Sequence, residues 1–182
     1  MRLAEADFLI VPGIGNSGPE HWQTRWQARF PTAYRVEQEN WDTPDPEQWT
    51  SRIVDMVAEA KRPIILVAHD CGVAAVLLAA PYLAPLKIRG AYLVACPDVE
   101  RGDMPEALRA FAPLPSAPLP FPSLLVASRD DPLCGMERAQ GIALDIGAAL
   151  VDAGNSGHID TASGHGPWPE GLMRLATFMK GL

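Results

Sequence analysis

The chain has 182 residues, of which 48% are hydrophobic and 20% are charged, so a disordered chain is excluded and one domain is expected over residues 1–182. A formal net charge of -7 argues against nucleic acid or an anionic membrane surface as the main partner. We interpret this acidity as ordinary solubility.

Short apolar runs alternate with helical segments along the chain. The predicted strands lie, in chain order, at residues 8–11, 34–38, 64–68, 91–95, 124–127 and 149–151. The predicted helices begin at Pro19, span residues 45–60, run from the end of the third strand to Pro81, span residues 136–146 and begin again at Pro169. The proline-rich stretch 96–122 is predicted to be a loop, because strand-like sequence resumes directly after it.

The alternation of these elements indicates the fold class. Strands that are apolar throughout and alternate with helices predict an α/β fold, with a mostly parallel sheet and helices on both faces. In such a sheet, ligands bind at the carboxyl ends of the strands. The informative residues are therefore those that directly follow each predicted strand.

The segment VAHDCGV, residues 67–73, has the layout of a nucleophile elbow. A strand comes before it and a helix after it, and small residues lie two positions before and two positions after its tip. The tip carries serine in such elbows, whereas this chain has Asp70. A carboxylate is tolerated at this position, because the N-terminus of a helix favours an anion.

The loops after the fifth and sixth predicted strands supply two possible partners for the elbow. The first holds Asp130 and Asp131, and the second holds His158. The order nucleophile, acid, histidine is that of the α/β-hydrolases, in which the histidine takes a proton and the carboxylate orients its ring. Asp131 precedes Pro132, where the backbone is stiff, so we favour it over Asp130 and leave the choice open.

An oxyanion hole needs two backbone N–H groups that are aimed at one point. The amide of Cys71, directly after the elbow tip, is expected to supply one of them. The glycine-rich loop around Gly13 and Ile14 is expected to supply the other. The Cys71 thiol is not expected to be a nucleophile, because the elbow turns this residue inward. His165 and Trp168, near the histidine loop, are candidates for lining the pocket.

Five segments, spread over nearly the whole chain, each resemble a motif of one known protein family. They are PGIGNSGPEHW (12–22), NWDTPDPEQW (40–49), VAHDCG (67–72), SRDDPLC (128–134) and GHIDTASGHGPWPEG (157–171). Together they resemble the retinoblastoma-binding-protein-9-like (YdeN-like) family of small serine hydrolases. The resemblance implies a compact α/β-hydrolase without a separate cap domain. It also implies acyl hydrolysis of a small ester-like molecule by a Ser-Asp-His triad on positions 70, 131 and 158.

Two positions depart from the pattern of that family. Asp70 replaces its serine, and Asp160 stands where asparagine is expected. An aspartate cannot form the acyl-enzyme ester that serine forms, so we expect acyl hydrolysis to be lost or greatly reduced. The sequence alone leaves open whether Asp70 is natural or introduced.

An aspartate in the elbow also suggests two alternative functions. Haloalkane dehalogenases and epoxide hydrolases have H-D-x-G elbows that resemble this one, and their aspartate displaces a leaving group from saturated carbon. Asp70 and Asp131 on either side of His158 are expected to raise its pKa until Asp70 is esterified. The second alternative is a binding module that keeps the pocket without turnover.

The segment from Gly13 to Gly18 is also a G-x-G-x-x-G motif after a strand. Glu37 and Glu39 follow about 20 residues later, as a dinucleotide site requires. Pro19 argues against this interpretation, because it indicates that the helix begins only after Gly18.

The cysteines and the N-terminus bear on metals and location. Cys71, Cys96 and Cys134 form neither a CxxC pair nor a metal-ligand spacing, so we expect reduced thiols, no metal, no cofactor and a cytoplasmic protein. The N-terminus lacks the layout of a signal peptide, and no stretch approaches the roughly 20 apolar residues of a membrane span. The oligomeric state is left open.

Overall fold

The computed structural model describes residues 5–83 and 87–182, and it has the α/β architecture that the sequence predicts. Six parallel strands form one sheet in the order β2-β1-β3-β4-β5-β6. The strands are β1 (Asp7–Val11), β2 (Ala33–Arg35), β3 (Ile64–His69), β4 (Ile88–Val94), β5 (Ser123–Ala127) and β6 (Ala149–Asp152). The helices are α1 (Trp22–Arg29), α2 (Pro46–Glu59), α3 (Cys71–Leu83), α4 (Glu106–Arg109), α5 (Met136–Asp145) and α6 (Pro169–Lys180).

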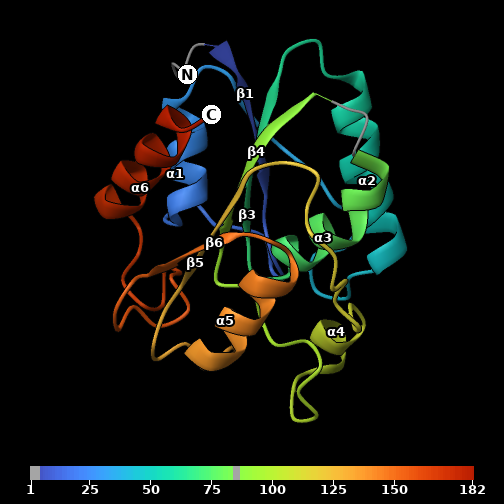
Figure 1. The fold of residues 1–182 in the computed structure, drawn as a ribbon, viewed down its shortest axis with the longest axis vertical. Helices are drawn as coiled ribbons and strands as arrows, with labels where there is room; N and C mark the ends of the chain where they lie inside the picture. Colours follow the sequence, from blue (N-terminus) through green and yellow to red (C-terminus); the bar gives the residue numbers. More distant parts are fainter. Residues whose placement is uncertain (1–4, 84–86) are drawn as a thin grey trace.

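Helices cover both faces of the sheet (Figure 1). On one face, Trp22 and Trp26 of α1 and Leu175 of α6 belong to one buried cluster. On the other face, Trp49 of α2 and Ile142 of α5 join α3 in a second cluster. The central strand β3 is buried at all six positions, because its alternating side chains fill both layers. No helix in the described part of the chain is long and apolar enough to cross a membrane.

The first helix begins later than the sequence indicates. Its first residue is Trp22 rather than Pro19, which lies in a turn before the helix. His21 is the N-cap, and its Nδ1 accepts a hydrogen bond of 3.2 Å from the amide of Gln23. A side-chain acceptor at the N-cap satisfies an amide that the helix itself leaves free, so it fixes the starting point better than the proline does.

The second strand is shorter than predicted. It covers Ala33–Arg35 rather than residues 34–38. Only β1 pairs with it, and the pairs run from Phe8 with Ala33 to Ile10 with Arg35. The strand therefore ends opposite Ile10, one residue before the end of its single neighbour β1.

The proline-rich stretch between β4 and β5 is largely irregular and carries the short helix α4. Its apolar side chains Met104, Leu108 and Phe111 are buried in the same cluster as those of α2 and α3. The excursion thus packs onto the main core, which fits a compact α/β-hydrolase fold without a separate cap domain.

Candidate active site

Asp70 lies at the tip of a sharp turn between β3 and α3. Its φ of 53° is in the left-handed region, which a residue other than glycine adopts only when the surrounding structure holds it there. A Cβ on Gly72 would collide with the carbonyl oxygen of Val11, and a Cβ on Gly13 would collide with the Asp70 carboxylate. The predicted strand–turn–helix geometry is therefore present, and two glycines allow its close approaches.

The Asp70 carboxylate is buried and held on one side. The amide of Ile14 donates a 2.9 Å hydrogen bond to Oδ2. Burial raises the pKa of Asp70, but His158, His69 and a hydrogen bond from the Cys71 amide outweigh it, so the net pKa is lowered. The carboxylate is therefore ionised at neutral pH and faces both amides that the sequence assigns to the oxyanion hole.

His158 lies between two carboxylates. Its Nδ1 lies 3.0 Å from both oxygens of Asp131, and its Nε2 lies 3.4 Å from Oδ1 of Asp70, which is long for a hydrogen bond. Burial lowers the pKa of His158, but the contacts with Asp131 and Asp70 outweigh burial and raise it to about 10. The imidazole is therefore protonated at neutral pH.

Asp130 makes different contacts from Asp131 and does not hydrogen-bond to the His158 ring. Its Oδ1 accepts hydrogen bonds of 2.7 Å from the Ser128 hydroxyl and 2.8 Å from the Gly157 amide. It thereby joins the loop after β5 to the loop that carries His158. The structure brings Asp131 to the His158 ring, and Asp130 instead fixes the backbone around it.

Two buried side chains hold the backbone at His158. Nε2 of His69 lies 2.9 Å from the His158 carbonyl oxygen, and Nε1 of Trp22 donates a 2.9 Å hydrogen bond to the carbonyl of Ile159. Burial lowers the pKa of His69 to about 4, so the ring is neutral and must carry its proton on Nε2 to donate. Ile159 has a φ of 51°, which is rare for a β-branched residue.

The loop after β1 is fixed by a network of polar side chains. Nη1 of Arg35 donates to Asn16 Oδ1 at 2.5 Å and to the Ser17 carbonyl at 3.0 Å. Nε2 of Gln23 donates to the carbonyls of Val11 and Val67 at 3.2 and 3.1 Å. These contacts hold the Ile14 amide in place relative to the ends of β1 and β3.

A cavity of about 290 Å³, which we call the Asp70 cavity, opens beside these groups. Its lining residues are Gly13, Ile14, Asn16, Gly18, His21, His69, Asp70, His158, Asp160, Thr161 and Ala162. The predicted pocket-lining residues His165 and Trp168 are not among them. Trp168 is buried and packs on Trp22 and Trp26, with ring centroids 5.1 and 5.8 Å apart, and His165 packs against Trp168.

The thiols and the possible metal ligands do not form a site of their own. Cys71, Cys96 and Cys134 are free and buried. Burial raises the pKa of the Cys71 thiol, so this residue can offer its amide but not a thiolate. Among the described residues, no group of three or more His, Cys, Asp or Glu side chains lies close enough to hold a metal ion.

The glycine-rich loop does not have the geometry of a dinucleotide site. Such a site places the last glycine in the first turn of a helix. Here α1 begins at Trp22, after Gly18 and a further turn, and the Ile14 amide is directed at Asp70. Glu37 and Glu39 lie beside a separate groove along α2.

His21, His69 and Asp160 belong to the site although no sequence motif marks them as site residues. The first two lie next to recognised motifs, before Trp22 and before Asp70, and their spacing gives no sign that their rings meet. In the structure their ring centroids are 4.9 Å apart. Asp160 stands where the resemblance predicts asparagine, and it lies in the wall of the cavity.

Comparisons with known proteins point to one family. The family model described as serine hydrolase matches residues 8–177. A search of curated proteins finds no match. The crystal structure of a YdeN-like hydrolase from Pectobacterium atrosepticum is 34% identical with a TM-score of 0.86, and the match covers 98% of this chain and 93% of that chain.

Two further solved structures are similar in fold. The ydeN gene product from B. subtilis has 20% identity and a TM-score of 0.75, with 96% of this chain and 99% of that chain covered. The RedJ thioesterase from the prodiginine pathway of Streptomyces coelicolor has 14% identity and a TM-score of 0.68, with 97% and 92% covered. At these identities the likeness concerns the fold alone.

Proposed function

The chain belongs to the serine hydrolase family, and on that premise we propose that it is an esterase-like α/β-hydrolase whose acyl hydrolysis is lost or greatly reduced by Asp70. The observation that carries the proposal is the hydrogen bond of 2.9 Å from the Ile14 amide to Oδ2 of Asp70. The carboxylate uses the donor that an acyl hydrolase needs for the oxyanion of its tetrahedral intermediate.

Three groups have the places of a hydrolase triad in this proposal. Position 70 is the nucleophile position, His158 is the general base and Asp131 orients the imidazole through Nδ1. With Asp70 present, two features oppose acyl transfer. The carboxylate competes with a substrate carbonyl for the Ile14 amide, and the protonated His158 cannot accept a proton.

The chemistry of the carboxylate opposes acyl transfer as well. Attack of Asp70 on an ester carbonyl leads toward a mixed anhydride. In the tetrahedral intermediate on this path, the Asp70 carboxylate is a better leaving group than the alkoxide of the substrate. The tetrahedral intermediate would therefore return to substrate. A serine hydroxyl at position 70 forms a stable ester instead, after His158 takes its proton.

A second candidate function is hydrolysis at saturated carbon, and the two oxygens of Asp70 favour it. Oδ2 is held by Ile14, whereas Oδ1 accepts no hydrogen bond from the described residues and faces the His158 imidazole at 3.4 Å, so Oδ1 is the oxygen available to attack. In this reaction Oδ1 forms a bond to carbon, and the leaving group departs with the electron pair of the bond that breaks. The charge of Asp70 is then gone, which allows His158 to lose its proton and become a base.

The second half of that reaction also uses groups already in place. His158 takes a proton from water, and the resulting hydroxide attacks Cγ of the Asp70 ester. The negative charge develops on Oδ2, which the Ile14 amide already faces. Collapse of this intermediate breaks the bond between Cγ and Oδ1. The alkyl group leaves with Oδ1 and takes the proton from His158 to form the alcohol, and the water oxygen, after loss of its remaining proton, completes the restored carboxylate.

Covalent labelling with an alkyl fluorophosphonate tests the first candidate. The Asp70→Ser variant should displace fluoride and gain one phosphonyl adduct at position 70, whereas the unmodified protein and Asp70→Ala should gain none. Intact-protein mass spectrometry followed by peptide mapping measures the adduct. Failure of the serine variant to react, while it remains folded by circular dichroism, would show that position 70 is not a nucleophile site.

Trapping of an alkyl ester tests the second candidate. His158→Ala removes the base for the second step, so an epoxide or alkyl bromide should leave a stable adduct on Asp70. The His158→Ala/Asp70→Asn double variant is the control and should gain no adduct. Peptide mapping that finds no modification of Asp70 with either reagent would remove this candidate.

A further inference from the structure

The side chains that line the Asp70 cavity carry more negative than positive charge. Asp70 and Asp160 are its carboxylates, and the lining described above contains neither lysine nor arginine. Burial lowers the pKa of His21 to about 3 and that of His69 to about 4, so both rings are neutral at neutral pH. His158 is the one cation among the described lining residues.

The positive charge of His158 is already neutralised by a carboxylate on the Nδ1 side of its ring. Asp131, which is buried, lies 3.0 Å from Nδ1 through both of its oxygens. Three carboxylates therefore surround one imidazolium, and the site has an excess of negative charge. A ligand anion would be repelled by this field, and a ligand cation would be attracted.

Asp160 has one oxygen that is held and one that is left for a ligand. Oδ1 accepts hydrogen bonds of 2.8 Å from both the amide and the hydroxyl of Ser163. No donor to Oδ2 is found among the described residues. Burial raises the pKa of Asp160, but the hydrogen bonds from Ser163 outweigh it and lower the net pKa. The wall of the cavity thus carries an ionised acceptor in a fixed place.

A separate observation also indicates a ligand in this cavity. Oδ1 of Asp70 and Nε2 of His158 are buried and have no hydrogen-bond partner in the described part of the chain. Asp70 is only 7% exposed, and both residues line the cavity. Nε2 of His158 lies 3.4 Å from Oδ1, which is long for a hydrogen bond, so Oδ1 keeps the capacity to accept a hydrogen bond from a ligand.

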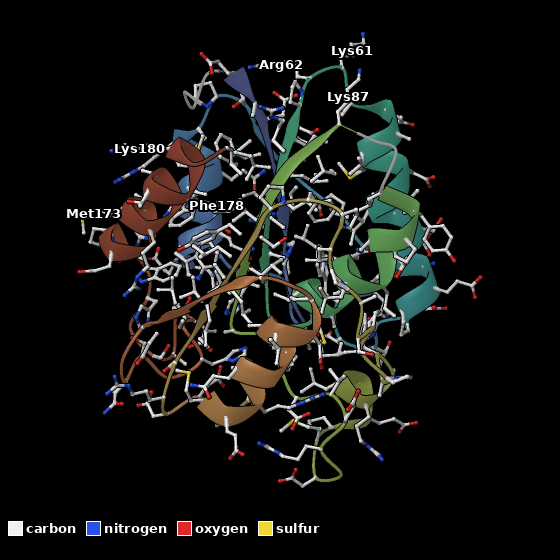
Figure 2. The ribbon with its side chains drawn as sticks, viewed as in Figure 1. Lys61, Arg62, Lys87, Met173, Phe178 and Lys180 are labelled. Carbon is white, nitrogen blue, oxygen red and sulfur yellow. The ribbon has the colours of Figure 1, made fainter. Side chains whose placement is uncertain are left out.

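Arg35 is the arginine beside the cavity, where it donates to the wall residue Asn16 and to the Ser17 carbonyl, and three further cationic side chains lie at the far end of the sheet. Figure 2 shows Lys61, Arg62 and Lys87 at the end of the sheet where β3 and β4 begin, opposite the carboxyl ends that hold Asp70. They are too far away to neutralise the carboxylates of the cavity at physiological salt.

From these observations we propose that the Asp70 cavity selects small organic cations, with Oδ2 of Asp160 accepting a hydrogen bond from a primary ammonium group. The volume of about 290 Å³ suits a small ligand. The inference rests on the proposed function in one respect, because it concerns the same site, and it names the charge class of the molecule bound there.

Binding of three probes that differ only in their polar end tests the proposal. They are butylammonium, butan-1-ol and butanoate, titrated into the unmodified protein while the imidazole resonances of His21 and His158 are followed by NMR. Butylammonium should bind about tenfold more tightly than butan-1-ol, the ratio that roughly 1.4 kcal/mol of charge interaction gives. Butanoate should bind more weakly than the alcohol, and high salt should reduce the preference for the cation.

A matched pair of variants assigns the preference to Asp160. Asp160→Asn keeps an oxygen that can accept from Ser163 and removes the charge, so it should abolish most of the preference for butylammonium. Asp145→Asn removes the same charge from the exposed end of α5 and should leave the preference unchanged. Backbone amide spectra of both variants report whether the loop after His158 keeps its fold.

The possible outcomes separate this proposal from the proposed function. Equal affinity for the three probes, tightest binding of butanoate, or an unchanged preference in a folded Asp160→Asn variant would each overturn the cation assignment. None of these results depends on turnover, so they do not change how the fluorophosphonate labelling is interpreted. Conversely, an unreactive Asp70→Ser variant that still prefers butylammonium would overturn the proposed function alone.

Discussion

The backbone amide of Ile14 donates a 2.9 Å hydrogen bond to Oδ2 of Asp70, 56 positions later in the chain. The donor follows β1 and the acceptor follows β3, and these strands are neighbours in the sheet. The carboxylate therefore lies in the part of the elbow where a serine hydrolase stabilises an oxyanion. This one contact explains how the fold accommodates an aspartate and why acyl transfer should suffer.

The first prediction concerns the titration of His158. Its pKa is raised to about 10, so its protonation stabilises the fold fully below the ordinary value near 6.5. This contribution should disappear as the pH rises through about 10. Asp70→Ser removes one of the two carboxylates, so the NMR titration midpoint of His158 should fall. Asp145→Asn serves as the charge control, and equal midpoints in all three proteins would contradict the geometry.

The second prediction separates Asp131 from Asp130. In an Asp70→Ser background that hydrolyses esters, Asp131→Asn should lower kcat by about 10³- to 10⁴-fold, because it leaves the His158 ring in the wrong tautomer. Asp130→Asn keeps an oxygen for Ser128 and Gly157, so its effect should be small by comparison. Steady-state kinetics of the two variants decide the point, and the reverse order would show that Asp130 is the acid.

The third prediction compares a glycine that has no room for a Cβ atom with a glycine that has open space around it. A Cβ on Gly13 would collide with Asp70, whereas a Cβ on Gly102 meets nothing within 4 Å. Gly13→Ala should therefore lower the free energy of unfolding by about 1–3 kcal/mol, the usual cost of overpacking. Gly102→Ala should leave it nearly unchanged. Urea unfolding of both variants gives the comparison, and equal midpoints would mean that the elbow is looser than described.

The fourth prediction treats His69 as a positioning residue for His158. In the Asp70→Ser background, His69→Phe removes the donor to the His158 carbonyl and should lower kcat by about tenfold or more, with little change in KM. His69→Gln supplies an N–H at a similar place and should restore part of the loss. The midpoint of the pH–rate profile should shift in the phenylalanine variant only. A loss confined to KM would argue against positioning.

Much of the site was predictable because its parts follow strands. The apolar runs before Asp70, Asp131 and His158 mark the carboxyl end of a parallel sheet, and that end brings the three residues together. The pattern of small residues around Asp70 likewise predicted the turn. These features are local in sequence, so spacing was enough to find them.

The remaining parts of the site depend on tertiary contacts. The place of Asp160 in the cavity wall follows from its turn with Ser163. The His21 and His69 rings meet where the start of α1 is tied to β3 by the hydrogen bond from Gln23 to the Val67 carbonyl. Trp168 shows the opposite error, since its position next to the histidine loop suggested the pocket. It packs instead on Trp22 in the core. Sequence distance from a motif does not determine the direction of a side chain.

Hydrolysis of a short p-nitrophenyl ester by the unmodified protein, Asp70→Ser and Asp70→Ala tests the central claim most directly. Asp70→Ser should gain clear turnover, because loss of the carboxylate lowers the pKa of His158 and allows its imidazole to act as a base. The other two proteins should stay at background. Turnover by the unmodified chain equal to that of the serine variant would contradict the account, because the carboxylate on the Ile14 amide would then not suppress acyl transfer. An inert but folded serine variant would contradict the triad itself.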